Sequence, residues 1–268
     1  MSLDIFASSI LVALVFLPLF AWKWLVRIWI GILAGIAIGS VTGFVVFQID
    51  LAVAGLNMAA LVLIELVFIL MITILIIIAR FYRDPKRIPI ETKNVILAPA
   101  DGRVVYVNRV EKGSSLISTK GGRKFKLEEI TTTNLLADAT FLIGIDMNLL
   151  DVHINRSPIA GKAILQKHIK GRFMSLRKEE SEILNERVST IIDNGAFRVG
   201  IVRIASRLVR RIVSYIREGD SVEIGQRIGA IVFGSQVDVA IPELENLRIE
   251  VKSGDKTKAG VSIIARYS

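Results

Sequence analysis

Three long apolar stretches fill the first eighty residues of this 268-residue chain, and they limit its fold more than any other feature. They cover residues 5–22, 28–49 and 58–79. A helix needs about 20 apolar residues to span the core of a bilayer, so the second and third stretches are long enough and the first is marginal. A signal peptide would explain only the first stretch, and its amino-terminal flank lacks positive charge. The sequence therefore predicts three transmembrane helices.

The basic residues beside these stretches predict the orientation. Lys23 and Arg27 lie between the first two stretches, whereas the loop between the second and third carries Asp50 and no Lys or Arg. A second basic group follows the third stretch and consists of Arg80, Arg83, Lys86 and Arg87. The positive-inside rule places both groups in the cytoplasm. We therefore expect a multi-pass protein of the cell membrane, with a membrane region and linker at 1–87 and a cytoplasmic domain at 88–268.

Two features inside the apolar stretches concern helix packing. Glycines recur at every fourth position of the second stretch, at Gly31, Gly35, Gly39 and Gly43. Small residues at this spacing let membrane helices approach closely, either within one chain or between two subunits of a homodimer. Glu65 lies in the third stretch, where a carboxylate is costly. Both snorkelling to the interface and hydrogen bonding between helices are open roles for it.

The charge of the chain bears on its partners. Residues 88–268 carry +7 of the formal net charge of +9. A basic domain joined to membrane helices suits an anionic lipid surface. We expect no nucleic-acid partner, because no recognition-helix, zinc or aromatic-basic motif accompanies the charge. We also expect no metal, because the chain has no cysteine and only two isolated histidines, His153 and His168.

Turn signals at short intervals after residue 88 predict a mainly β domain of short strands and hairpins, which makes the whole chain α+β. Residues 95–107 read as a strand, a tight turn at Asp101-Gly102, and a second strand. Asn194-Gly195 is typical of a two-residue hairpin turn. The region 207–217 has a period that fits helix or strand equally well. Its arginines are either a solvated face or partners of a phosphate, and the candidates are Arg207, Arg210 and Arg211.

Two further features indicate chemistry. The pair Gly234-Ser235 interrupts a run of β-branched apolar residues. A glycine there marks a bend or a close approach to the backbone, although Gly and Ser are also ordinary turn residues. His153 follows a predicted buried strand and precedes a Ser-Pro turn. A lone histidine is often structural, but histidine is also the usual general base at neutral pH.

Together these motifs resemble the phosphatidylserine decarboxylase family, in particular its short form and the archaeal enzymes that act on archaetidylserine. Two positions depart from the pattern, since Gln236 stands where Arg is expected and Ser206 stands where Gly is expected. The similar segments occur in the family's order and are residues 81–85, 98–102, 151–158, 185–187, 204–212 and 225–242.

The resemblance implies a lyase that is made as a zymogen and depends on a pyruvoyl group. Ser235 would attack the carbonyl group of Gly234 in an autocatalytic cleavage. His153 would take the serine proton and Asp101 would hold the imidazole, because an unaided serine is a poor nucleophile. Ser235 would then become the pyruvoyl group, so that neither a metal nor a diffusible cofactor is needed.

The resemblance also implies the substrate and the products. The pyruvoyl carbonyl would condense with the amino group of a serine-headgroup phospholipid and take up the electrons left as CO2 departs. His153 would supply the proton that replaces CO2, giving the ethanolamine lipid. Phosphatidylserine and archaetidylserine are both consistent with the sequence. The β chain, 1–234, and the α chain, 235–268, would stay folded together as partners.

Two other classes of protein share parts of this pattern. Residues 219–229 look like a biotinyl/lipoyl-like hammerhead, which would make the chain a non-enzymatic membrane-anchored protein. That domain needs a modified lysine on a hairpin, and no Met-Lys-Met-like site is present. A membrane-anchored zinc peptidase would need clustered His and Asp ligands. We therefore predict the decarboxylase.

Overall fold

The chain forms two compact units, one helical and one made of β-strands, and each is described by itself. The helical unit comprises Met1–Tyr82 together with the short segment Asn148–Leu150, and the β unit comprises Arg83–Met147 and Asp151–Ser268. The computed structural model describes residues 2–268 with the exception of 24–25, 54–55, 110–115, 119–123, 127–138, 172–183, 206–211 and 232–234.

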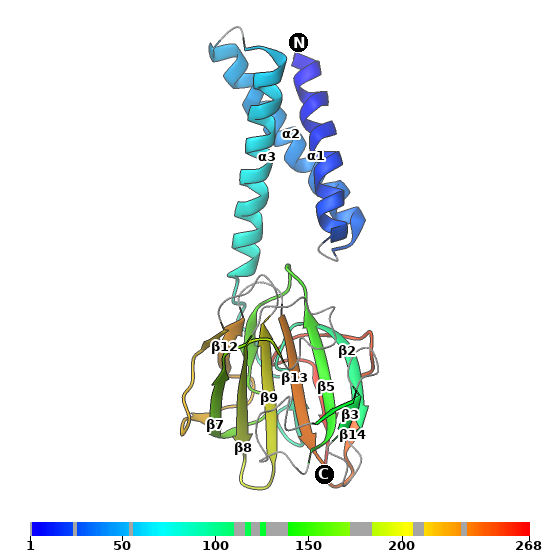
Figure 1. Cartoon of the computed structure of the whole chain (residues 1–268), viewed down its shortest axis with the longest axis vertical. Helices are drawn as coiled ribbons and strands as arrows, with labels where there is room; N and C mark the ends of the chain where they lie inside the picture. The colour runs from blue at the N-terminus through cyan, green and yellow to red at the C-terminus, as the bar shows by residue number, and fades with distance from the viewer. Residues whose placement is uncertain are drawn as a thin grey trace. The chain divides into compact units, whose positions relative to one another are not determined.

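The helical unit contains three helices that lie side by side (Figure 1). They are α1 (Ser2–Lys23), α2 (Ile28–Val53) and α3 (Met58–Phe81). Each is long and apolar enough to cross a membrane, which agrees with the three predicted spans. Asn57 caps the start of α3 by accepting a hydrogen bond from the backbone N–H of Ala60 at 2.9 Å.

The glycine face of α2 packs against α1 of the same chain. A Cβ atom on Gly39 would lie 2.7 Å from Cα of Ile10, and one on Gly31 would lie 2.8 Å from the carbonyl oxygen of Leu17. Glu65 of α3 is 1% exposed, and its Oε2 accepts a hydrogen bond from Ser8 Oγ of α1 at 2.7 Å. Of the roles left open by the sequence, the structure therefore gives the glycines a contact within the chain and Glu65 a bond between helices.

The β unit is built around one large antiparallel sheet. Its eight strands run in the order β11-β7-β8-β9-β13-β5-β2-β15. Their bounds are β2 (Gly102–Arg109), β5 (Ala139–Met147), β7 (Gly161–Ile169), β8 (Arg187–Asp193), β9 (Arg198–Ala205), β11 (Ser221–Val222), β13 (Ser235–Pro242) and β15 (Lys256–Thr257). Strand β13 lies inside this sheet, hydrogen-bonded to β5 on one side and to β9 on the other (Figure 1).

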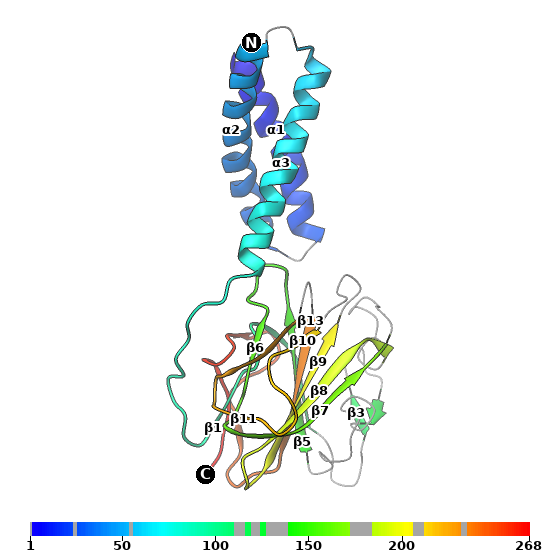
Figure 2. The ribbon, with the colours of Figure 1, turned by 90° about the vertical axis from the view of Figure 1, so that its left-hand side faces the viewer.

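Three small sheets complete the described part of the β unit. One has the order β10-β12-β6, another β1-β16-β14, and the third pairs β3 with β4 (Figure 2). Their bounds are β1 (Val95–Leu97), β3 (Leu116–Ser118), β4 (Lys124–Lys126), β6 (Ile154–Arg156), β10 (Ile212–Ser214), β12 (Arg227–Ile231), β14 (Arg248–Ile249) and β16 (Ile263–Arg266). This mainly β unit, preceded by apolar helices, confirms the predicted fold class.

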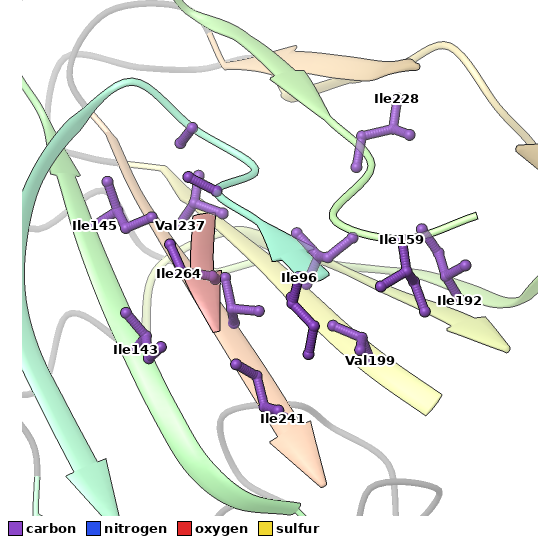
Figure 3. Packing of buried hydrophobic residues seen from close by; sticks show 14 of the residues in the cluster. Ile96, Ile143, Ile145, Ile159, Ile192, Val199, Ile228, Val237, Ile241 and Ile264 are labelled. Atoms are coloured by element: carbon purple, nitrogen blue, oxygen red, sulfur yellow. The ribbon is translucent and has the colours of Figure 1, made fainter. Parts of the chain in front are cut away.

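The core of the β unit is a cluster of isoleucine, valine and alanine side chains from the large sheet and from strands β1, β12 and β16. Figure 3 shows Ile143 of β5, Val199 of β9 and Ile241 of β13 beside Ile96 of β1 and Ile264 of β16. These side chains are fully buried. Burying a side chain of this size stabilises the fold by roughly 1.5–3 kcal/mol relative to exposure.

Two turns differ in detail from the sequence predictions. Strand β1 pairs with β16 rather than with β2, so Asp101-Gly102 carries the chain from one sheet to another and closes no hairpin between its flanking strands. Asn194-Gly195 does lie in a hairpin, but the loop covers residues 194–197, since Asp193 pairs with Arg198. The Asn194 side chain explains the longer loop, because its Oδ1 accepts hydrogen bonds from the backbone of Ala196 and Phe197.

Candidate active site

The topology brings the end of β12, three residues before Gly234, to His153. Ile231, the last residue of β12, donates a hydrogen bond from its backbone N–H to the carbonyl oxygen of His153 at 3.2 Å. Ser235 then begins β13, where its Cα partners are Met147 of β5 and Ala205 of β9. The short connection 232–234, which includes Gly234, lies outside the described residues, as does the side chain of Ser235.

His153 is a buried, neutral imidazole. The residue is 1% exposed, and burial lowers its pKa to about 4. The hydrogen bond to the Asp151 carbonyl and the charge of Asp101 raise this pKa, whereas the charge of Arg83 lowers it. Nδ1 lies 2.9 Å from the Asp151 carbonyl oxygen, which can only accept, so Nδ1 carries the proton and Nε2 carries the lone pair. This is the protonation state that a general base requires.

Asp101 is held by an ion pair and by a backbone amide. Arg87 donates from Nη2 to Oδ2 at 2.8 Å and from Nη1 to Oδ1. The backbone N–H of Ala259 donates to Oδ1 at 2.8 Å. Bidentate pairs of this kind fix the plane of a carboxylate as well as its charge. Asp101 is therefore an oriented carboxylate in an ion pair, and its charge acts on His153.

Asn155 is a further buried polar group of this region. It is fully buried on β6, and its Nδ2 lies 4.0 Å from Sδ of Met147, the β5 residue opposite Ser235. The amide therefore lies among the residues that surround the start of β13.

The other candidates from the sequence are placed as follows. Arg207, Arg210 and Arg211 lie outside the described residues, between the end of β9 and the start of β10. His168 is surface-exposed and pairs with Glu186 at 2.8 Å. Within the described residues, no group of three or more His, Asp or Glu side chains is arranged to hold a metal ion.

Sequence reasoning missed two charged residues of this region, Asp84 and Arg87. We placed the basic residues from Arg80 to Arg87 in the linker of the membrane region, because basic residues after a membrane helix are ordinary there. The structure instead binds both side chains to the β unit. The position of Asp84 could have indicated these contacts, because a carboxylate among four basic residues and before a proline is unusual in a linker that contacts anionic headgroups.

The fold and the site define a protein in which three helices long and apolar enough to cross a membrane precede a β unit with a buried histidine. A family model described as phosphatidylserine decarboxylase matches residues 74–265. A putative archaetidylserine decarboxylase proenzyme of Methanocaldococcus jannaschii is 40% identical over 72% of this chain and 91% of its own length. A phosphatidylserine decarboxylase proenzyme of Pelodictyon phaeoclathratiforme is 33% identical over 70% of this chain and 77% of its own length.

The chain belongs to the phosphatidylserine decarboxylase family. The resemblance drawn from the sequence is thereby confirmed, as is the prediction of an enzyme. The alternative of a non-enzymatic protein with a biotinyl/lipoyl-like domain is wrong, because the matched region, residues 74–265, covers nearly all of the β unit rather than a hammerhead within it.

Proposed function

We propose that this chain is a proenzyme that cuts itself between Gly234 and Ser235 and then removes CO2 from a serine-headgroup phospholipid. One observation carries the proposal: the hydrogen bond from Ile231 to the carbonyl of His153 ties a neutral buried base to the segment that precedes Ser235. Membership of a family whose relatives are called proenzymes supports it.

The first reaction is an acyl shift followed by an elimination. Ser235 Oγ attacks the carbonyl carbon of Gly234, His153 takes the hydroxyl proton, and the proton passes to the departing nitrogen as the ester replaces the amide. Loss of the Ser235 α-proton then breaks the ester C–O bond. Gly234 is left as a carboxylate and residue 235 as a dehydroalanine. Addition of water and loss of ammonia convert this residue into a ketone, the pyruvoyl group.

Each nearby residue has a stated part in this scheme. His153 is neutral at physiological pH because burial lowers its pKa to about 4. The Asp151 carbonyl, rather than Asp101 as predicted, accepts from Nδ1 of His153, so Asp101, fixed by Arg87 and Ala259, would stabilise the imidazolium through its charge. These two side chains fit a group made from Ser235, because His153 can take the serine proton and Asp101 can stabilise the charge that results.

The second reaction acts on the lipid. A pyruvoyl group supplies a carbonyl that condenses with a primary amine and accepts the electron pair released with CO2. His153, once protonated, donates to the carbon that has lost CO2. Arg207, Arg210 and Arg211 are our candidates for binding the phosphate of the headgroup, because a guanidinium fork matches phosphate oxygens.

The membrane helices place the enzyme beside a substrate that stays in the bilayer. Three helices are able to cross a membrane. The basic residues after α1 and α3 favour a cytoplasmic β unit by the positive-inside rule. Both phosphatidylserine and archaetidylserine are substrates to test, because the serine headgroup is common to them.

Intact-mass measurement of the purified chain tests the proposal. We expect two chains that separate after residue 234, and we expect hydride reduction to convert the terminal ketone of the smaller chain to an alcohol. Ser235→Ala should remain a single chain, while Ser221→Ala, at an exposed strand position, should cleave normally. The cleaved protein should release CO2 from vesicles of one or both serine lipids. A wild-type protein that stays intact in such vesicles would contradict the proposal.

A further inference from the structure

The segment that follows α3 binds to the rest of the β unit through three ion pairs. We call residues 84–89 the strap. It begins three residues after Phe81, the last residue of α3, and it belongs to the β unit. Its charged residues Asp84 and Arg87 each contact strands or loops that carry the candidate active site.

Arg87 contacts the loop that carries Asp101 and the loop that carries Ala259. Besides its bidentate pair with Asp101, it donates from Nη1 to the Ala259 carbonyl at 2.9 Å. The side chains of Arg87 and Asp101 are each 10% exposed. Because a nearly buried ion pair is screened little by salt, loss of Arg87 would leave Asp101 with an uncompensated charge and one fewer constraint on its plane.

Asp84 acts on the two strands that position His153. Its Oδ2 lies 2.6 Å from Nε of Arg227, which begins β12, and its Oδ1 lies 3.4 Å from Nη2 of Arg156, which ends β6. Arg156 and Arg227 are directly opposite each other in the β6–β12 pair. Like charges in this position destabilise a strand pair, so the carboxylate of Asp84 offsets a repulsion where β12 leads toward His153 and residue 234.

The strap is fitted closely to its binding place. Arg156 also donates to the carbonyl of Pro85 at 3.1 Å and to that of Gly225 at 2.9 Å. A Cβ atom on Gly225 would lie 2.9 Å from Cγ of Pro89, and one on Gly260 would lie 2.7 Å from Cδ of Arg156. Both glycines have positive φ, 76° and 69°. Glycine thus stands where a side chain would displace Pro89 of the strap, and where one would displace Arg156, which binds the strap.

We propose that the strap is an intramolecular activator: Asp84 and Arg87 are positioning residues that set His153 and Asp101 for self-cleavage, and a chain whose strap is not bound stays uncleaved. The inference rests on the proposed cleavage at Gly234–Ser235. The inference adds a requirement to that cleavage: the strap, which supplies neither the nucleophile nor the base, must be bound before the chain is cut.

The test compares Arg87→Met, Arg87→Lys and Asp84→Asn with a matched control, Arg198→Met. Arg198 also pairs with a carboxylate, Asp193 at 2.9 Å, but in the hairpin between β8 and β9. The full-length chains are synthesised in the presence of vesicles, and the cleaved fraction is followed by intact mass. We expect Arg87→Met and Asp84→Asn to slow cleavage by about 10- to 100-fold, Arg87→Lys to be intermediate, and the control to match the wild type.

The pH dependence separates positioning from general destabilisation. Asp101 and Arg83 are the charged groups whose fields act on His153. Removing the charge of Arg87 leaves the field of Asp101 unopposed, so the pH at which cleavage reaches half its maximal rate should rise in Arg87→Met. A variant that merely folds poorly would lose yield at every pH without moving that midpoint.

The outcomes distinguish this inference from the proposed function. If the wild type never splits after residue 234, the proposed function fails. If the wild type splits there and both Arg87→Met and Asp84→Asn split at its rate, only the role of the strap is refuted. An unchanged pH midpoint in a slowed Arg87→Met would also refute positioning and leave a structural role.

Discussion

The backbone N–H of Ile231 donates a hydrogen bond to the carbonyl oxygen of His153 at 3.2 Å. This bond extends the pairing of β12 with β6 by one position beyond Ala230 and Ile154. The position of the imidazole is therefore set by the strand that leads to the proposed cleavage site. A shift in the pairing of β6 and β12 would therefore change the distance between His153 and the residues that lead to Ser235.

The first prediction concerns pH. Cleavage needs neutral His153, whose pKa is lowered from 6.5 to about 4. The rate should therefore stay level as the pH falls through 6.5 and decline only as it approaches about 4. Initial rates of chain separation between pH 3 and pH 8, in buffers of about equal ionic strength, measure this. A decline centred on the ordinary histidine pKa would show that His153 is not the base in this environment.

Substitution of the two histidines gives the second prediction. His153→Gln should slow self-cleavage by about 100-fold or more, the usual contribution of a general base. His168→Gln is the matched control, because His168 is half-exposed and pairs with Glu186 on the surface. Normal cleavage of His153→Gln in an intact-mass time course would remove His153 from the mechanism.

A third prediction concerns the contact between α1 and α2. Gly39→Val should destabilise the helical unit by about 1–3 kcal/mol, because the new methyl groups would overlap the backbone of Ile10. Ala37→Val adds two methyl groups at an exposed position of α2 and should have little effect. Thermal unfolding in detergent, followed by circular dichroism, compares them. Equal unfolding temperatures would mean that α2 does not pack on α1 through its glycines.

The bond between Ser8 and Glu65 gives the fourth prediction. Ser8→Ala and Glu65→Leu each remove the hydrogen bond, so the double variant should lose little more than either single one. Coupling energies for such bonds within membranes are about 0.6–1.7 kcal/mol. A double-mutant cycle on the same unfolding assay measures it, and strictly additive losses would argue against the bond.

A fifth prediction concerns Arg203, a fully buried side chain of β9 that donates to the carbonyl of Val213 and to Ser214 Oγ. Burial lowers its pKa to about 10. A Cβ atom on Gly229 would overlap Nη1 of Arg203, so Gly229→Ala should destabilise the β unit by about 1–3 kcal/mol. Adding Arg203→Met should relieve part of the overlap. If the losses in the double variant add in full, the overlap is not the cause.

The parts of the fold that depend on local patterns were predictable. Helices α1, α2 and α3 follow from runs of apolar residues, and the turn at Asn194-Gly195 follows from its composition. The pairing of β1 with β16 was not predictable, because it joins the first strand of the β unit to the last. No local pattern carries a contact over that separation.

The same distinction applies to the candidate site. Ser235, His153 and Asp101 were named from motifs, and these residues remain proposals for the roles assigned to them. The contacts of Asp84 with Arg156 and Arg227 join residues that are far apart in the chain, and a charged residue next to a membrane helix looks the same whether it faces headgroups or protein. These contacts can therefore be identified only from the folded structure.

The double-sided pairing of β13 has a consequence for the lifetime of the mature enzyme. The proposed cut before Ser235 would leave β13 paired with β5 and with β9 from Gln236 onward. Beyond it, β15 stays paired with β2, and β16 with β1. The strands of the short chain are thus paired with strands of the long chain, and the two chains should dissociate only on the timescale of global unfolding. Activation by the proposed cleavage would therefore create a new chain end without creating a subunit that can be lost.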